Sequence, residues 1–144
     1  MKKGFTMIEL IFVIVILGIL STVALLKLSA TRDDADITKA LADIRTAVND
    51  FGSYYTTQGH FGKISDMTNV SAFKWSADVN LTDNPKFITH DEECLLFQAG
   101  LEGNFTITPV TASPSGTVCK GVLNSPTFKN IAKTYNFGGH GVNP

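Results

Sequence analysis

Two hydrophobic patterns follow one another along the first 58 residues of the chain. Residues 5–26 are almost entirely apolar, and the hydrophobic side chains would surround a helix rather than form one face. As a helix, those 22 residues would span about 33 Å, which matches the roughly 30 Å hydrocarbon core of a bilayer. The pattern therefore predicts a helix that lies in lipid or in a wholly apolar bundle.

From about residue 30 the pattern becomes amphipathic. Apolar residues recur in alternating steps of four and three, so they fall on one face of a helix. This face comprises Ile37, Leu41, Ile44, Val48, Phe51 and Tyr55, widened by Ala40, Ala47 and Tyr54. A coiled coil is the alternative, but the repeat is short, and we expect the face to pack on the chain's own sheet. The helix should end near Thr57, before Gly59.

The polar remainder of the chain predicts a small antiparallel sheet. Cys94–Ala99 is a compact apolar run, and Phe105–Pro109 alternates apolar with polar residues, so the two should form a hairpin. Residues 59–93 are expected to be mostly irregular, with a helical turn in Ile64–Val70 and an extended stretch at Ala72–Val79. The segment after Cys119 predicts one or two short helical turns. The fold class is therefore α+β, a long N-terminal helix packed on a small antiparallel β-sheet head.

Aromatic residues in the head are expected to belong to its small core. Tyr135, Asn136 and Phe137 are predicted to form a last short strand. Phe73, Trp75 and Phe87 are interpreted as core residues rather than as a platform for a ligand.

Charge and motifs narrow the classes of function. The net charge is −1 and no basic stripe is present, so the electrostatic footprint of a nucleic-acid-binding protein is missing. His60, His90 and His140 are scattered without metal-ligand spacing, and no phosphate loop or nucleophile motif occurs. Calcium needs six to eight oxygen ligands, so residues 91–93 (Asp-Glu-Glu) are interpreted as a solvated acidic turn. We expect no catalytic site, metal or cofactor.

Glu9 is the one charge inside the apolar run, where a carboxylate at mid-bilayer costs roughly 3 kcal/mol or more. Lys2 and Lys3 precede the run and mildly favour a cytoplasmic N-terminus with the head outside. A cleaved secretory signal would also begin with a charged region, but no clear A-x-A site with a following break occurs. An ordinary membrane anchor leaves Glu9 unexplained.

The two cysteines, Cys94 and Cys119, both lie in the polar half of the chain. The N-terminal segment argues for export, and two cysteines in an exported domain usually pair. Two buried free thiols are the alternative.

The run KGFTMIEL, followed by an apolar helix, resembles the class III signal of type IV prepilins and pseudopilins. Gly4, Phe5, Thr6 and Glu9 match its pattern of a short basic leader that ends in Gly, then Phe, Thr and, at the fifth mature position, Glu. The resemblance is close over residues 2–25, looser to about residue 57, and architectural beyond. It implies a leader at 1–4, a transmembrane and assembly helix at 5–29, its amphipathic half at 30–58, and a globular head at 59–144.

The resemblance also implies a role for each matching residue. A prepilin peptidase would cut between Gly4 and Phe5 and methylate the new amine of Phe5. Glu9 would offset the positive amine of a neighbouring subunit during assembly. A comparable C-terminal bridge in many family members supports pairing of Cys94 with Cys119. One departure is Leu26, which stands where many relatives have a proline, so we expect an uninterrupted helix.

The function expected from this resemblance is a structural subunit of a type IV pilus or a type II secretion pseudopilus. Expected partners are identical or homologous pilin subunits, prepilin peptidase, an inner-membrane assembly platform and, before assembly, membrane lipid. The chain would cross the inner membrane once with a periplasmic head, and then enter a filament in the periplasm or at the cell surface. The competing hypothesis is a membrane-anchored periplasmic binding or enzymatic domain with an uncleaved signal anchor.

Overall fold

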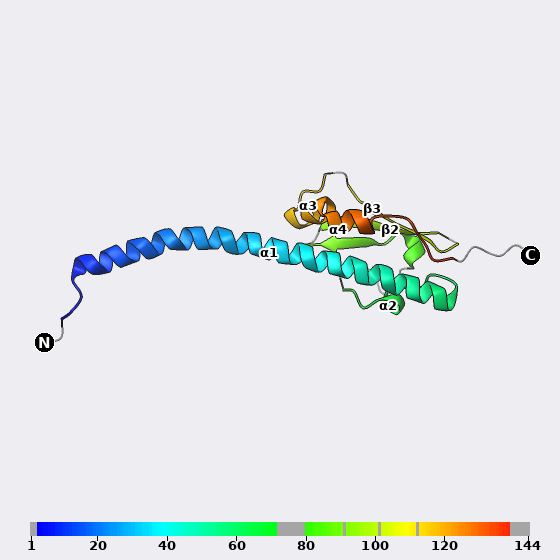
Figure 1. The fold of residues 1–144 in the computed structure, drawn as a ribbon, viewed down its shortest axis with the longest axis horizontal. Helices are drawn as coiled ribbons and strands as arrows, with labels where there is room; N and C mark the ends of the chain where they lie inside the picture. The colour runs from blue at the N-terminus through cyan, green and yellow to red at the C-terminus, as the bar shows by residue number, and fades with distance from the viewer. Residues whose placement is uncertain (1–2, 72–79, 91, 101, 112, 139–144) are drawn as a thin grey trace, which may run out of the picture. The chain divides into compact units, whose positions relative to one another are not determined.

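The computed structural model describes residues 3–71, 80–90, 92–100, 102–111 and 113–138. The chain divides into two compact units, Met1–Ala35 and Asp36–Pro144. Helix α1 (Met7–Gln58) begins in the first unit and ends in the second (Figure 1). The elements after it are α2 (Ile64–Met67), the 3-10 helix η1 (Leu81–Asp83), β1 (Lys86–Thr89), β2 (Glu92–Ala99), β3 (Asn104–Pro109), α3 (Thr117–Asn124), α4 (Pro126–Ile131) and β4 (Tyr135–Asn136).

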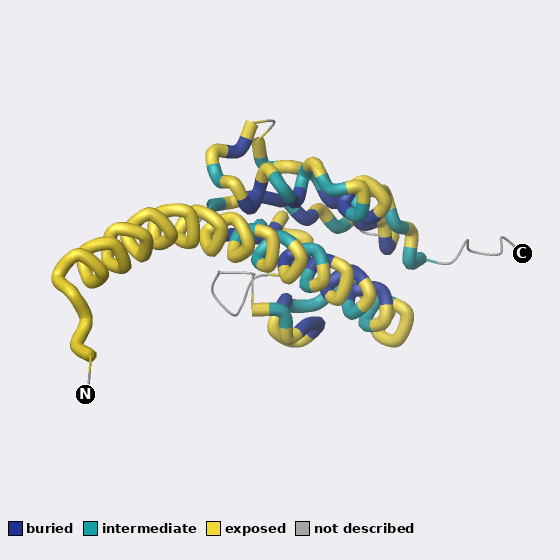
Figure 2. Tube along the Cα trace, turned by 60° about the vertical axis from the view of Figure 1, so that its left-hand side comes forward, coloured by how far each residue is buried: buried dark blue, intermediate teal, exposed yellow. Residues whose placement is uncertain are grey.

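The first unit buries none of its described side chains, as the uniform exposure in Figure 2 shows. Its helix passes Leu26 without a break, as expected from the missing proline. The hydroxyl of Ser21 donates to the carbonyl oxygen of Leu17 at 2.7 Å, and that of Thr22 to Ile19 at 2.8 Å. These two polar groups are therefore satisfied within the helix, as a lipid environment requires.

The second unit contains a four-stranded sheet in the order β1-β2-β3-β4, with every neighbouring pair antiparallel. The central pairing of β2 with β3 sets Phe97 opposite Ile107, so the predicted hairpin is confirmed. Gly103 closes the turn before β3 with a φ of +76°, a conformation that glycine adopts at little cost. The predicted last strand is present as the two-residue β4.

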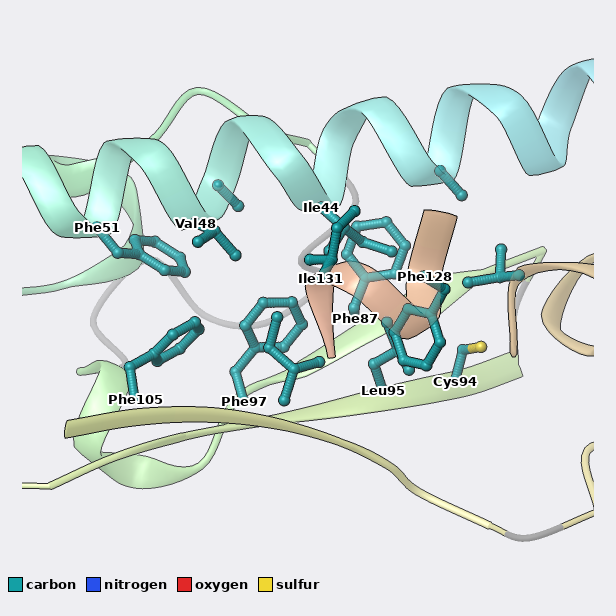
Figure 3. Close-up of a cluster of buried hydrophobic side chains, with 14 of the residues drawn as sticks. Ile44, Val48, Phe51, Phe87, Cys94, Leu95, Phe97, Phe105, Phe128 and Ile131 are labelled. Atoms are coloured by element: carbon teal, nitrogen blue, oxygen red, sulfur yellow. The ribbon is translucent and has the colours of Figure 1, made fainter. Parts of the chain in front are cut away.

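The core of the second unit lies between α1 and the sheet. Figure 3 shows Ile44, Val48 and Phe51 projecting from α1 towards the aromatic residues of the strands, while α4 adds Phe128 and Ile131. Phe51 meets the rings of Phe97 and Phe105 edge-on, at centroid distances of 6.2 and 5.6 Å. The amphipathic face thus packs on the chain's own sheet, as predicted, rather than in a coiled coil.

Parts of the connector differ from the sequence expectation. β1 was not predicted, because residues 59–93 were interpreted as mostly irregular, yet Phe87 is only 1% exposed and pairs opposite Leu95. Its place in the core is as expected. The helical turn predicted in Ile64–Val70 is α2 and ends at Met67. The extended stretch predicted at Ala72–Val79, with Phe73 and Trp75, lies outside the described residues.

Candidate functional site

The N-terminal candidate residues come together at the start of α1. Thr6 directly precedes the helix, and its backbone N–H and its hydroxyl both donate to Oε2 of Glu9, each at 2.8 Å. The backbone N–H of Glu9 in turn donates to the Thr6 hydroxyl at 3.3 Å. This reciprocal arrangement is a capping box, which satisfies amide groups that a helix start leaves unpaired.

The capping box satisfies one oxygen of Glu9 but leaves its charge uncompensated. Among the described residues, no cation forms an ion pair with Glu9, and Oε1 accepts no hydrogen bond. Sequence reasoning named both Thr6 and Glu9 but missed the bond between them. The T-x-x-E spacing was the local signal that could have revealed it.

Glu9 also borders an open groove of about 370 Å³ on the first unit. The other lining residues are Phe5, Ile8, Phe12 and Val13. Phe5, the expected new N-terminus, therefore lines the same groove as the carboxylate. An apolar groove with one charged group at its wall suits a partner with an apolar body and a cationic end.

Within the described residues, every exposed large hydrophobic side chain belongs to one stretch, Phe5 to Leu28. Such a continuous apolar surface marks contact with a membrane or with other protein chains. Helix α1 is also the one described helix that is long and apolar enough to cross a membrane. The stretch therefore has the length and the surface of an anchor and of an interface.

Gly4 has an open setting in this chain. A Cβ atom added at Gly4 would meet no other atom within 4 Å. The fold of this chain therefore places no demand for glycine at that position, and any such demand must come from a molecule that acts on it.

Cys94 of β2 and Cys119 of α3 form a disulfide in the structure, with their Cα atoms 5.6 Å apart. Both residues are 1% exposed. This is the pairing that the sequence led us to expect. It fixes α3 to the sheet across a sequence separation of 25 residues.

A second attachment lies two residues before Cys94. The Glu92 carboxylate accepts hydrogen bonds from the backbone N–H of Ser115 at 2.7 Å, the Ser115 hydroxyl at 3.0 Å, and the Gly116 N–H at 2.8 Å. The pKa of Glu92 is lowered, and the largest cause is the hydrogen bond from the Ser115 backbone N–H. Desolvation of the carboxylate acts in the opposite direction and raises the pKa. We call this set of bonds the Glu92 clasp.

The clasp corrects the interpretation of residues 91–93 as a solvated acidic turn. Glu92 and Glu93 belong to β2, and Glu93 pairs with Lys86 at 2.5 Å. Asp91 lies outside the described residues. No local pattern could have revealed the clasp, because Ser115 is 23 residues away in sequence.

The histidines do not gather into a site. His90 Nε2 lies 2.9 Å from Asp36 Oδ2. The His60 ring lies 6.2 Å from the Tyr54 ring, at a tilted angle, and His140 lies outside the described residues. In the described part of the chain, no three His, Cys, Asp or Glu residues are placed to hold a metal ion. The absence of a metal stays a prediction for the whole chain.

Comparison with known proteins identifies the N-terminal segment. Residues 1–25 match the family model described as the prokaryotic N-terminal methylation motif. No curated protein and no solved structure matches the chain significantly. The match covers the capping box and most of the exposed apolar stretch, whereas the head is characterised by its own geometry alone.

Proposed function

We propose that this chain, whose first 25 residues carry the prepilin-type methylation signal of type IV pilins and pseudopilins, is a structural subunit of a type IV pilus or a type II secretion pseudopilus. The observation that carries the proposal is a single carboxylate, Glu9, in an apolar surface that the described residues leave exposed. A subunit that assembles through this surface accounts for both features. An ordinary anchor accounts only for the apolar one.

Processing is the first step of the proposed mechanism. Prepilin peptidase cuts the peptide bond between Gly4 and Phe5 and then methylates the new amine of Phe5. A methylated secondary amine stays protonated at neutral pH, so cleavage creates a cation at the membrane depth of Glu9. While the leader at 1–4 is attached, the nitrogen of Phe5 is an uncharged amide, so the cation that assembly needs forms only on cleavage.

Assembly is the second step. Before it, the Thr6 N–H and hydroxyl hold Glu9 in the capping box, which lowers the cost of a carboxylate in lipid. The amine of a neighbouring subunit then offsets the charge of Glu9 and sets the register of the incoming chain. Residues 5–29 exchange lipid for other helices, and the amphipathic half at 30–58 carries the head at 59–144.

The proposed location follows from these steps. The chain waits in the inner membrane with its N-terminus in the cytoplasm and its head in the periplasm, and an assembly platform moves it into the filament. The partners are identical or homologous subunits, and the role is structural rather than catalytic. The prepilin-type signal and the long helix on a small sheet support this role.

Intact-mass measurement of the membrane-extracted protein tests the proposal. We expect a mass that lacks Met1–Gly4 and carries one added methyl group. A full-length, unmethylated chain would instead support the competing hypothesis of a periplasmic domain on an uncleaved anchor, and would rule out the filament role.

Gly4 provides a matched pair of variants for the same measurement. Gly4→Leu should stop cleavage, whereas Gly18→Leu should be processed normally. Added side chains at both positions meet nothing within 4 Å in this chain, so a difference reports on the peptidase. Normal processing of Gly4→Leu would contradict the assignment of the cleavage site.

A further inference from the structure

The turn before β3 contains a five-residue pattern that the proposed function does not use. The pattern is an acidic residue, any residue, Asn, any residue except Pro, and then Thr. It is formed by Glu102-Gly103-Asn104-Phe105-Thr106. The same pattern recurs around Asn80, as Asp78-Val79-Asn80-Leu81-Thr82. Asn-x-Ser/Thr is the acceptor sequence for asparagine-linked glycosylation in exported proteins.

The acidic residue distinguishes these two acceptor sequences from a third one. Asn69-Val70-Ser71 also fits Asn-x-Ser/Thr, but Met67 occupies the position two residues before its asparagine. Only 13 of the 144 residues are acidic, so a carboxylate at this position in two of three cases exceeds what composition predicts. A carboxylate beside the acceptor gives a transferase a charge to bind.

The structure presents the acceptor atoms of the first site to solvent. Glu102 and Asn104 are exposed, and Thr106 is half-exposed, whereas Phe105 between them is fully buried. Alternation along β3 sets residues 104 and 106 on the same face of the sheet, away from the core. The side-chain amide of Asn104 makes no hydrogen bond with the described residues, so its nitrogen is available.

The described residues of the second site repeat this exposure pattern, but the Asn80 side chain also accepts a hydrogen bond from the Asp83 backbone N–H in a capping box. Asn80 and Thr82 are exposed, and Leu81 between them is fully buried. The backbone N–H of Asn80 donates to Asp83 Oδ2 at 3.1 Å, which holds the start of η1 in place. Asp78 lies outside the described residues, so it belongs to this acceptor sequence by its position in the chain alone.

We propose that Asn104 and Asn80 are acceptor sites for an asparagine-linked oligosaccharide. The donor class is an oligosaccharide carried on a polyprenyl diphosphate. The amide nitrogen of the asparagine attacks the anomeric carbon of the first sugar, and a carbon–nitrogen bond forms. The bond from that carbon to the diphosphate oxygen breaks, the polyprenyl diphosphate leaves, and the amide proton passes to a base of the transferase.

This inference rests on the proposed function, because the head must leave the cytoplasm to meet such a donor. It also orients the subunit in the filament. An oligosaccharide on Asn104 would occupy the space outside the paired Asn104 and Asn136, at the β3–β4 edge of the sheet. That edge must therefore face away from neighbouring subunits.

Intact-mass measurement and peptide mapping of the full chain from its native cells test the proposal. We expect the processed chain to carry two oligosaccharide increments. Asn104→Gln and Asn80→Gln should each remove one increment, and the double variant should remove both. Asn69→Gln is the control and should leave the mass increments unchanged. Increments that persist in the double variant would overturn the proposal.

Two further variants separate recognition of the site from folding of the strand. Thr106→Ser keeps the acceptor hydroxyl and should stay modified at Asn104, whereas Thr106→Val keeps a β-branched residue in β3 and should lose that increment. Glu102→Gln should lower occupancy of Asn104 several-fold. Equal occupancy in all three variants would count against the acceptor role of Asn104.

The same spectrum distinguishes failure of this inference from failure of the proposed function. A chain that lacks Met1–Gly4 and carries the methyl group but no oligosaccharide would overturn the glycosylation alone. A full-length chain without methyl group or oligosaccharide would overturn both.

Discussion

The two halves of α1 differ in how their apolar residues are arranged and in what those residues contact. The described residues of the first unit expose every large hydrophobic side chain, with Phe12 at 67%, whereas Ile44 and Phe51 in the second unit are fully buried. Figure 2 shows this contrast along the helix of each unit. The difference teaches that a helix segment apolar on every side suits lipid or other chains, whereas a segment with one apolar face packs that face on the chain's own sheet.

Glu9 gives the strongest way to test the assembly role of the exposed half. Glu9→Ala removes the one carboxylate in residues 5–26, which we propose pairs with a neighbour's amine, and we expect filament yield to fall about tenfold or more. Glu9→Gln keeps an oxygen for the Thr6 hydrogen bonds but lacks the charge, so it should assemble as poorly. The measurement is the amount of subunit in sheared filament preparations, with intact mass as a control for processing.

The capping box supplies the matched control for Glu9. Thr6→Val removes the hydroxyl donor but keeps the backbone donor and the shape of the side chain. We expect it to lower yield much less than Glu9→Gln. Normal filament yield from Glu9→Gln would mean that the charge of Glu9 is not needed.

Two phenylalanines on α1 test the contrast between its halves directly. Phe51→Ala leaves a cavity among aromatic rings and should lower the free energy of unfolding of the head by about 3–5 kcal/mol. Phe12→Ala should leave head stability unchanged, because Phe12 is exposed and lies outside that core. Thermal unfolding of the full chain in detergent, followed by near-ultraviolet circular dichroism, measures both. Equal melting temperatures would contradict the core assignment.

The disulfide should contribute somewhat less than the core. Its sequence separation of 25 residues corresponds to about 3–4 kcal/mol in the chain-entropy account. Reduction should therefore lower the melting temperature of the head. The double variant Cys94→Ala/Cys119→Ala should melt like the reduced protein and not respond to reductant. A melting temperature that reduction leaves unchanged would indicate unpaired thiols in the protein as isolated.

The sequence predicted those helices and strands that are encoded by the spacing of neighbouring apolar and polar residues. The four-three spacing from Ile37 to Tyr55 predicted the packed half of α1, and the alternation after Gly103 predicted β3. β1 was not predicted because Lys86–Thr89 is only four residues long and is stabilised by pairing with β2. No local sequence pattern encodes that contact. The Glu92 clasp was not predicted for the same reason, because Ser115 and Gly116, which donate to Glu92, are distant in the sequence.

The smallest expected effect concerns the pH dependence of the Glu92 clasp. The pKa of Glu92 is lower in the folded chain than its ordinary value of 4.5. The clasp therefore stabilises the head fully above about pH 4.5, and this contribution is lost as pH falls through the lower folded pKa. Glu92→Gln should melt below the unaltered protein at pH 7, and the difference should shrink on acidification below pH 4.5.

Glu102→Gln provides the control for this pH profile. Glu102 is an exposed carboxylate on the hairpin turn, and its side chain accepts no hydrogen bond from the described residues. Glu102→Gln should therefore melt close to the unaltered protein, so that a melting difference in Glu92→Gln reports on the clasp and not on the loss of a carboxylate alone. If the Glu92→Gln difference stayed constant from pH 7 to pH 3, the charge of Glu92 would not hold the loop. The disulfide would then be the main attachment between α3 and the sheet.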